Sequence, residues 1–361
     1  MFDTNGQWLI WGAGTYGKRL IKFMKDELTF AAVIDNNPVK QKGMFEGIRV
    51  ISFEQVKKEY PNAKIVIAQV YPNVIRDFLL AEHYKEYKDF VSIYDFIPRW
   101  FHAKYDELVI KVVNFASANA CTLVCENCQS FIPYLKKGKI YSADEMIANA
   151  ELLFKNIDRV FLINICLGES FLNKEISRFI KYLFDHYRER YGFVCILTNG
   201  TIVPADSELE IFAECGATIS ISDYTGDDEK IAVSLSRLVQ KCKDFGVDYY
   251  LNTSSDKSVW FDYGNPEMVT ETNPDKLKQR YQSCFKPGTG IRDGLLYGCQ
   301  AQNAAIAVAG VPGPEEGDYY DLRKPLTAES REELYKIISR SPDKNYISHC
   351  CRCYGTTPIN R

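Results

Sequence analysis

Residues 121–135 read CTLVCENCQSFIPYL and place Cys121, Cys125 and Cys128 within one short stretch of chain. An apolar run from Leu108 to Val113, which has the composition of a buried β-strand, precedes this stretch. Three thiolates on one loop can hold three corners of a [4Fe-4S] cluster and leave the fourth iron open. A structural zinc site is the alternative, although zinc usually takes four ligands in two separated pairs.

The chain that follows alternates apolar runs with amphipathic helical segments such as 175–187 and 231–245. Repeated strand-helix units predict an α/β fold with a parallel sheet, and five or six of them predict a full or partial (β/α) barrel. In such a barrel the chemistry takes place at the carboxyl ends of the strands. The strands expected after 108–113 are residues 159–165, 193–197, 217–222 and 248–252.

The first hundred residues show the same alternation on a smaller scale. Strands are expected at 8–11 and 30–35, with a helix between them, and Gly12-x-Gly14-x-x-Gly17 follows the first strand. Glycines at the mouth of a helix let backbone N–H groups approach a phosphate, and Asp35 at the end of the second strand suits a ribose hydroxyl. The pattern predicts an N-terminal Rossmann-like parallel sheet that binds a nucleotide. The alternative is a scaffold without a ligand.

The periodicity fades after about residue 270, where glycine, proline and cysteine become denser. Cys284 and Cys299 flank Gly294 in a C-x9-G-x4-C pattern, and the tail adds Cys350-x2-Cys353. A small region of this kind is typically held together by a metal rather than by a large core. The four cysteines predict either a second iron-sulfur cluster or a zinc ribbon, and Cys351 can replace one of them. The expected domains are residues 1–103, 104–270 and 271–361.

The cysteine loop resembles that of the radical S-adenosylmethionine (radical SAM) superfamily. Leu167-Gly168-Glu169-Ser170 is similar to the GGEP motif of that family, and 198–201 matches its TNGT segment. The resemblance implies that the open iron binds SAM, whose cleavage gives a 5′-deoxyadenosyl radical that abstracts hydrogen from a substrate. It also implies SAM contacts at Gly168, Glu169, Asn199, Ser220 and Ser222. Asn127 departs from the aromatic residue that the family often has before the third cysteine.

Two further resemblances cover the ends of the chain. The second cysteine set resembles the twitch region, a shorter relative of the SPASM domain, which implies an auxiliary [4Fe-4S] cluster on Cys284, Cys299, Cys350 and Cys353. Residues 11–50 resemble the nucleotide-sugar-binding domain of PglD-like sugar acyltransferases, which implies that Gly12, Gly14, Gly17 and Asp35 hold a nucleotide. As a whole, the chain looks like radical SAM proteins of bacterial surface-polysaccharide gene sets.

Composition excludes several other classes of protein. Lysine and arginine number 44 against 47 acidic residues, so the net charge of −3 does not suit a basic nucleic-acid binder. The chain has no signal-peptide pattern and no apolar run of about 18 residues, so no membrane partner and a cytoplasmic location are expected. In that compartment twelve cysteines indicate metal or redox chemistry rather than disulfides. The four histidines lack metal-ligand spacing, which favours surface or helix positions.

These patterns favour a radical SAM enzyme that oxidises, epimerises or rearranges a sugar in surface-polysaccharide biosynthesis. The expected substrate is a nucleotide-linked sugar precursor. A flavodoxin- or ferredoxin-like protein would supply the electron. The alternatives are a radical SAM enzyme that modifies peptides and a non-enzymatic metal protein that binds a nucleotide-sugar. Cys166 and Cys351 are conceivable hydrogen donors, although Cys166 suits simple packing better. Residues 260–263 line a sugar pocket or pack in the core.

Overall fold

The structure is a computed structural model that describes residues 2–69, 72–224, 229–253, 261–284, 288–339 and 346–355. The chain divides into two compact units, Met1–Lys111 and Val112–Arg361. Both are mixed α/β structures, as the alternation of strands and helices predicts. The expected division into 1–103, 104–270 and 271–361 stays a prediction. No helix among the described residues has the length and apolar character required to cross a bilayer.

Unit 1 contains a six-stranded sheet in the order β3-β4-β2-β1-β5-β6. All neighbouring strands are parallel except β3, which forms an antiparallel edge with β4. The strand order runs to one side from β1 through β2 and to the other side through β5, so ligands of such sheets bind beside the carboxyl end of β1. The strands are β1 (Trp8–Trp11), β2 (Val33–Ile34), β3 (Met44–Phe45), β4 (Ile48–Ile51), β5 (Lys64–Ile67) and β6 (Phe90–Ser92). The helices are α1 (Thr15–Phe23), η1 (Lys40–Lys42), α2 (Phe53–Glu59), α3 (Asn73–Ala81) and α4 (Ile93–Tyr105).

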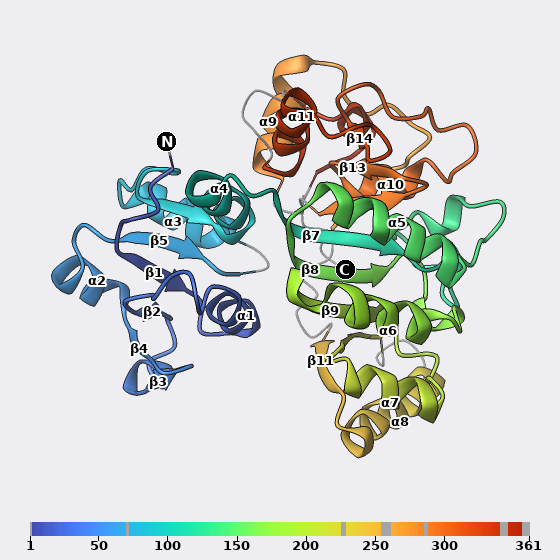
Figure 1. Cartoon of the computed structure of the whole chain (residues 1–361), viewed down its shortest axis with the longest axis horizontal. Coiled ribbons are helices and arrows are strands. Elements are labelled where there is room, and N and C mark those ends of the chain that lie inside the picture. Colours follow the sequence, from blue (N-terminus) through green and yellow to red (C-terminus); the bar gives the residue numbers. More distant parts are fainter. Residues whose placement is uncertain are drawn as a thin grey trace. The chain divides into compact units, whose positions relative to one another are not determined.

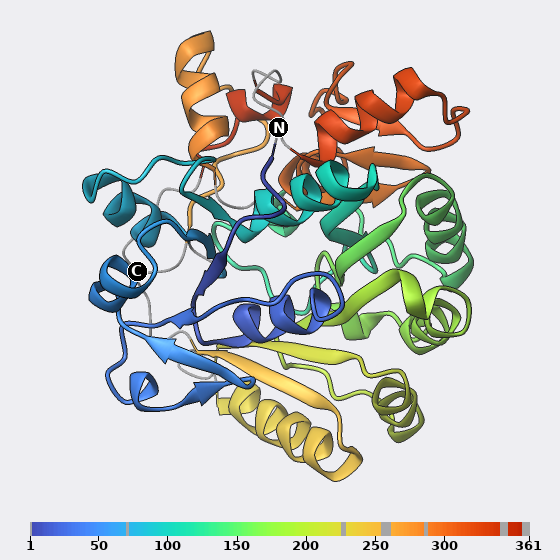
Figure 2. The ribbon, with the colours of Figure 1, turned by 60° about the vertical axis from the view of Figure 1, so that its left-hand side comes forward.

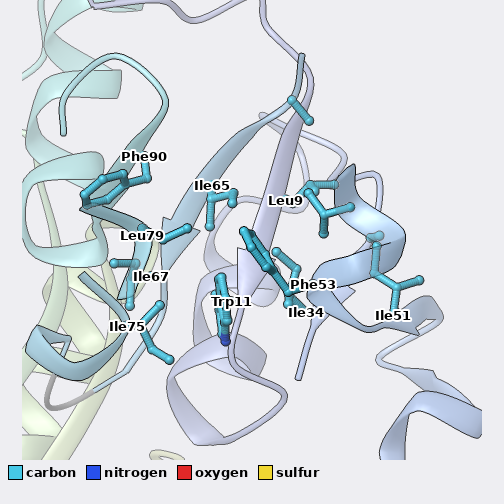
Figure 3. Packing of buried hydrophobic residues seen from close by; sticks show 13 residues of the cluster. Leu9, Trp11, Ile34, Ile51, Phe53, Ile65, Ile67, Ile75, Leu79 and Phe90 are labelled. Carbon is cyan, nitrogen blue, oxygen red and sulfur yellow. The ribbon is translucent and has the colours of Figure 1, made fainter. Parts of the chain in front are cut away.

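The core of unit 1 explains why its first strand is apolar throughout. All four residues of β1 are buried. On one face Trp11 packs against Phe53 of α2, with ring centroids 5.0 Å apart, within the cluster in Figure 3. On the other face Trp8 contacts Phe96 of α4 at 4.9 Å. A parallel strand covered on both faces requires a continuous apolar run rather than an alternating one.

Unit 2 is built on an eight-stranded sheet in the order β11-β10-β9-β8-β7-β12-β13-β14. Its five strands from β7 to β11 fall where the apolar runs predict them, each within about three residues at either end. The unit boundary falls inside β7. The strands are β7 (Val109–Ala116), β8 (Arg159–Cys166), β9 (Tyr191–Thr198), β10 (Thr218–Asp223) and β11 (Asp248–Thr253).

Helices cover one face of this sheet (Figures 1 and 2). Phe115 of β7 packs against Phe179 of α6, and the residues of β8 and β9 on that face, such as Ile165 and Ile196, are fully buried. Side chains alternate between the faces of a strand, so the other face carries Asn164 and Cys195, which are in register. The helices are α5 (Ala143–Asn156), α6 (Ile176–Tyr187), α7 (Asp206–Glu214) and α8 (Glu229–Phe245), with η2 (Ile132–Tyr134), η3 (Ser170–Leu172) and η4 (Arg188–Arg190).

The cysteine-rich segment continues the same sheet. β12 pairs in parallel with β7 on the side opposite β8, and β13 and β14 follow antiparallel. Asp293 and Gly294, both with positive φ (50° and 77°), form a two-residue hairpin loop between β12 and β13. Over the described residues no strand pair joins β11 to β14, and the partial barrel stays a prediction. The elements are α9 (Pro274–Ser283), β12 (Thr289–Arg292), β13 (Leu295–Tyr297), α10 (Gln300–Ala305), β14 (Tyr319–Asp321), α11 (Ala328–Ile338) and η6 (Ser348–Cys351).

Candidate functional site

The loop that carries the first three cysteines leaves the carboxyl end of β7 and is closed at its base. Tyr141 N donates to Ser117 O at 3.0 Å, and Ser117 N donates to Cys166 O at the end of β8 at 3.0 Å. Asn173, which is buried, donates its amide to Ser117 O at 3.1 Å and to Tyr141 O at 2.7 Å. The loop is therefore anchored to the ends of two parallel strands, where the sequence places the chemistry.

Cys121, Cys125 and Cys128 are partly buried in this loop. Burial raises the pKa of the Cys121 thiol, and the negative charges of Glu169 and Cys128 raise it further. A hydrogen bond from Leu123 N to Cys121 Sγ, 3.4 Å long, acts in the opposite direction. A cation beside the Cys121 thiol would offset both effects and favour its thiolate form, and Cys125 and Cys128 lie on the same loop as further sulfur donors. This donor set fits an iron-sulfur cluster.

The backbone conformation at position 127 suits asparagine. Its φ is 58°, in the left-handed region, which asparagine tolerates better than bulky residues do. Phe131, three residues after Cys128, also has a positive φ of 53°, and its N–H donates to Cys128 O at 2.9 Å. The loop therefore turns sharply on both sides of the third cysteine.

Gly168 brings the end of β8 against the cysteine loop. Its φ is 65°, and a Cβ at this position would lie 2.0 Å from Ala120 O and 2.9 Å from Ala118 O. The next residue, Glu169, donates its N–H to Ala120 O at 2.9 Å. Only glycine allows this approach, so the Gly-Glu pair fixes the backbone immediately before Cys121.

The Glu169 carboxylate is fully buried and links β8 to β9. It accepts hydrogen bonds from Phe171 N at 3.0 Å, Thr198 Oγ1 at 2.7 Å and Asn199 N at 2.8 Å. Burial raises the pKa of this carboxyl group, while these hydrogen bonds lower it. In this structure Glu169 therefore positions the start of the TNGT segment, and its contact with SAM stays a prediction.

Asn199 joins the TNGT segment to the cysteine loop. Its Nδ2 donates to Cys121 Sγ at 3.4 Å and to Thr122 Oγ1 at 3.1 Å. Thr201 adds a 2.6 Å hydroxyl contact with Thr122. Residues far apart in the sequence, Cys121, Glu169 and Asn199, thus meet at the ends of three strands. Ser220 and Ser222 lie on the neighbouring β10, where Ser220 accepts a 2.8 Å hydrogen bond from Asn252 of β11.

The face of the sheet opposite the helices carries several polar side chains. Asn114 of β7 accepts from Asn164 of β8 at 3.1 Å, and Cys195 of β9 contacts the hydroxyl of Tyr250 of β11 at 3.2 Å. Ser220 and Tyr250 are in register on this face. Amide and hydroxyl groups of this kind suit a substrate rich in hydrogen-bonding groups.

Cys166 lies on the same face, in polar surroundings. Its thiol donates to Asn114 Oδ1 at 3.5 Å, and Gln300 Nε2 lies 4.0 Å from Cys166 Sγ. Burial raises the pKa of this thiol from 9.0 to about 12. Cys166 is therefore a protonated thiol at neutral pH, a form that retains its S–H hydrogen.

Cys166 is expected to resist alkylation in the folded chain. At pH 8 a pKa of about 12 instead of 9.0 lowers the thiolate fraction, and with it the iodoacetamide rate, roughly a thousandfold. The rate should rise about tenfold per pH unit until the thiol ionises. Mass spectrometry of peptides from the labelled metal-free chain measures this, with the urea-unfolded chain as the control. Equal rates in the folded and unfolded chains would contradict the burial.

The second cysteine set surrounds a cavity of about 40 Å³. Burial raises the pKa of Cys353 to about 12, and the neighbouring thiols of Cys299 and Cys284 add to the shift. The pKa of Cys350 is raised by burial and by the same neighbours. The four thiols therefore share one space. The lining includes Arg280, Tyr281, Cys284, Gly298, Cys299, Ile347, His349, Cys350, Cys353 and Gly355.

Two facts limit the choice of metal at these cysteines. All twelve cysteines lie in the described parts of the chain, and none of them forms a disulfide. Among the described residues, no three His, Cys, Asp or Glu side chains meet closely enough to hold a single ion. Four thiols around one cavity nevertheless fit a multi-iron cluster, for which cysteine is the usual ligand.

The glycine-rich segment of unit 1 packs closely against the start of α1, and its binding of a nucleotide stays a prediction. Gly12 has a φ of 130°, and a Cβ on Gly17 would lie 2.1 Å from Gly12 O, so the loop packs tightly against the start of α1. Asp35 Oδ2 accepts from Ala13 N at 3.1 Å, which places the acid beside the loop. A Cβ on Gly14 would meet no atom within 4 Å, so open space lies at the amino end of α1.

Sequence reasoning missed three polar residues at these sites. Lys40 contacts both Asp35 Oδ2 at 3.1 Å and Ala13 O at 2.8 Å, and Arg280 and His349 line the second cavity. His349 lies in the short helix η6, one of the positions expected for the histidines, but it is buried there against Phe131 instead of facing solvent. Phe261 is buried too, which favours packing, whereas Trp260 lies outside the described residues. No spacing rule connects these residues with their partners.

Comparisons with known proteins give partial matches. The family model "C2185-like, N-terminal" matches residues 4–90, and no curated protein matches the chain. Among solved structures, the chain is similar to BtrN in complex with AdoMet and 2-DOIA, with 14% identity over 71% of this chain and 98% of that one and a TM-score of 0.44. The chain is also similar to anSMEcpe with bound AdoMet and a peptide. The identity is 13% over 63% of this chain and 83% of that one, with a TM-score of 0.40. A third similar structure is Streptococcus suis SuiB bound to the precursor peptide SuiA. The identity is 14% over 70% of this chain and 71% of that one, with a TM-score of 0.33.

Proposed function

We propose that the chain is a radical SAM enzyme that abstracts hydrogen from a carbohydrate, with a nucleotide-sugar as the substrate class. The observation that carries the proposal is the contact between the cysteine loop and the ends of β8 and β9. Gly168 packs against Ala120, and Asn199 donates to Cys121 Sγ. Structural cysteines require no such convergence, whereas a cofactor held between a loop and two strand ends does.

The proposed ligands divide into two sets. Cys121, Cys125 and Cys128 would hold a [4Fe-4S] cluster with an open iron, and the four cysteines of the second cavity would hold an auxiliary one. With SAM bound, the first cluster supplies the 5′-deoxyadenosyl radical that takes hydrogen from the substrate. Gly168, Glu169, Asn199, Ser220 and Ser222 would line the SAM site, where the buried carboxylate keeps Asn199 in place.

The polar face of the sheet favours a carbohydrate. Asn164, Ser222 and Tyr250 are at most partly buried there, so amide and hydroxyl groups remain within reach of a ligand. Sugars offer many hydroxyl groups, and a site that pairs each of them gains specificity. The tight glycine loop of unit 1 supports the choice of a nucleotide-linked form, with Gly12, Gly14, Gly17 and Asp35 as its proposed ligands.

Replacement of Asp35 tests this nucleotide site. If the carboxylate accepts hydrogen bonds from ribose hydroxyls, Asp35→Asn should weaken UDP-sugar binding about tenfold, or about 1.4 kcal/mol. Asp3→Asn is the control, because Asp3 is also ion-paired, to Lys64 at 2.6 Å, but lies outside the glycine loop. Titration calorimetry on the full chain measures both. Equal affinities for Asp35→Asn and the parent chain would exclude the acid from the site.

Deuterium transfer tests the activity itself. The reconstituted chain, with SAM, a strong reductant and a UDP-sugar deuterated on its ring carbons, should form 5′-deoxyadenosine that carries deuterium. With unlabelled sugar in deuterium oxide, one solvent deuterium in a stereoisomer of the substrate indicates epimerisation, whereas loss of two hydrogens from the sugar indicates oxidation. If no UDP-sugar transfers deuterium while a peptide does, the carbohydrate assignment is wrong. If no 5′-deoxyadenosine forms from SAM at all, the non-enzymatic alternative holds.

One observation favours peptide modification as the second candidate. β11 forms an edge of the sheet among the described residues, and its Leu251 is exposed. An exposed edge accepts an extended peptide as an additional strand. In that case deuterium transfer should come from labelled peptides, and Asp35→Asn should leave turnover unchanged.

A further inference from the structure

A single guanidinium ties the tail that carries Cys350 and Cys353 to helix α9. Arg280 lies in the last turn of α9, which leads directly into Cys284. Its Nη1 donates to Cys350 O at 2.7 Å and also to Cys353 O. The side chain lines the cavity between the four cysteines. Arg280 thus joins the segment that delivers one candidate ligand to the segment that delivers two others.

Further contacts hold residues 350–355 of the tail against α9 and the residues that precede it. Thr270 N and Glu271 N both donate to Cys351 O, at 2.7 and 3.1 Å. A Cβ on Gly355, whose φ is 76°, would lie 3.2 Å from Cγ of Arg280. The carbonyls of Cys350, Cys351 and Cys353 therefore all accept hydrogen bonds from residues 270–280.

We propose that Arg280 is a positioning residue, which holds Cys350 and Cys353 beside Cys284 and places a fixed positive charge next to the auxiliary cluster. The charge follows from chemistry, because a guanidinium stays protonated at all ordinary pH values. Net charge close to a cluster and hydrogen bonds around it set its reduction potential. A cation beside four thiolates favours the reduced, more negative state and so raises that potential. The positioning role of Arg280 does not depend on the proposed auxiliary cluster, whereas the effect of its charge on a reduction potential rests on that cluster.

The first test needs no metal. Arg280→Met removes the charge and both hydrogen bonds. Loss of the charge alone would slow alkylation of Cys353, because Arg280 lowers the pKa of that thiol. Alkylation of Cys350 and Cys353 by iodoacetamide should nevertheless be at least about tenfold faster in the metal-free chain, and would therefore report opening of the tail. In Arg280→Lys the alkylation rate should lie between those of Arg280→Met and the parent chain, because one ammonium group reaches fewer carbonyl oxygens than a guanidinium does. Lys276→Met is the matched control: it removes a cation one turn earlier on α9, where Lys276 pairs with Glu271 at 3.5 Å. Parent-like alkylation in Arg280→Met overturns the positioning role.

The second test measures the cluster in a chain that also carries Cys121→Ala, Cys125→Ala and Cys128→Ala. After anaerobic reconstitution this chain should hold about four irons, with one midpoint potential in a titration followed by electron paramagnetic resonance. Arg280→Met should lose iron or shift the potential to a more negative value, and Lys276→Met should do neither. An unchanged iron content and potential in Arg280→Met overturn the charge role. If alkylation rises but the background chain binds no iron, the positioning role stands and the auxiliary cluster is refuted.

Discussion

Replacing Cys121, Cys125 and Cys128 together by alanine is expected to abolish 5′-deoxyadenosine formation and to lower the iron content from about eight to about four atoms per chain. The three thiols are the proposed ligands of the cluster that binds SAM, and the second cavity lies on other segments of the chain. Iron and sulfide analysis after anaerobic reconstitution, with chromatography of the nucleoside product, measures both effects. This is the largest functional effect that the structure predicts.

Two buried cysteines provide the control. Cys215 ends helix α7 and Cys242 lies within α8, and burial raises the pKa of each thiol to about 11. Cys215→Ala and Cys242→Ala should keep the parent iron content, because neither thiol faces a candidate cluster site. The proposal fails if the triple variant retains about eight irons, or if the parent chain holds zinc in the loop after oxygen-free purification.

Gly168→Ala should destabilise the metal-free chain by about 3 kcal/mol or more and should reduce iron loading at the first site. The added Cβ would lie 2.0 Å from Ala120 O, so the backbone that precedes Cys121 must move. Moving that backbone also displaces the 2.9 Å bond from Glu169 N to Ala120 O. Urea unfolding followed by circular dichroism measures the stability, and iron analysis measures the loading.

Gly216 separates the two causes of this effect. It has nearly the same backbone conformation, with a φ of 64°, but a Cβ there would meet no atom within 4 Å. Gly216→Ala should therefore cost only about 1 kcal/mol, which is the conformational part alone, and should leave iron loading unchanged. Equal losses in the two variants would mean that Gly168 does not press against the cysteine loop.

The sequence predicted the elements of unit 2 better than their connections. Apolar runs located β7 to β11, because a strand buried under helices must be apolar on at least one face. The same periodicity contains no information on which strand lies next to which. The pairing of β12 with β7, across more than 170 residues, could not be read from it. Pairing of that range depends on the whole sheet rather than on local preference.

The candidate sites were foreseen at their cysteines and glycines but not at the groups that orient them. Cysteine spacing and the Gly-Glu pair mark a loop and a turn, which are local features. The roles of Asn199, Lys40 and Arg280 depend on contacts with residues distant in sequence. Glu169 shows the same limit: its motif suggested a ligand, whereas the structure gives its carboxylate three donors from the protein itself.

The place of β12 in the large sheet has a consequence for the modularity of the chain. β7 is buried along its whole length and is covered by β8 on one edge and by β12 on the other. A truncation that deleted β12 to β14 would expose the edge of β7 that β12 covers. The unpaired N–H and C=O groups of that edge would be a template for aggregation. The segment that contains β12 to β14 is therefore a structural part of the large sheet and not an independent module. Transfer of strands β7 to β11 to another scaffold would have to include β12 or supply a substitute strand.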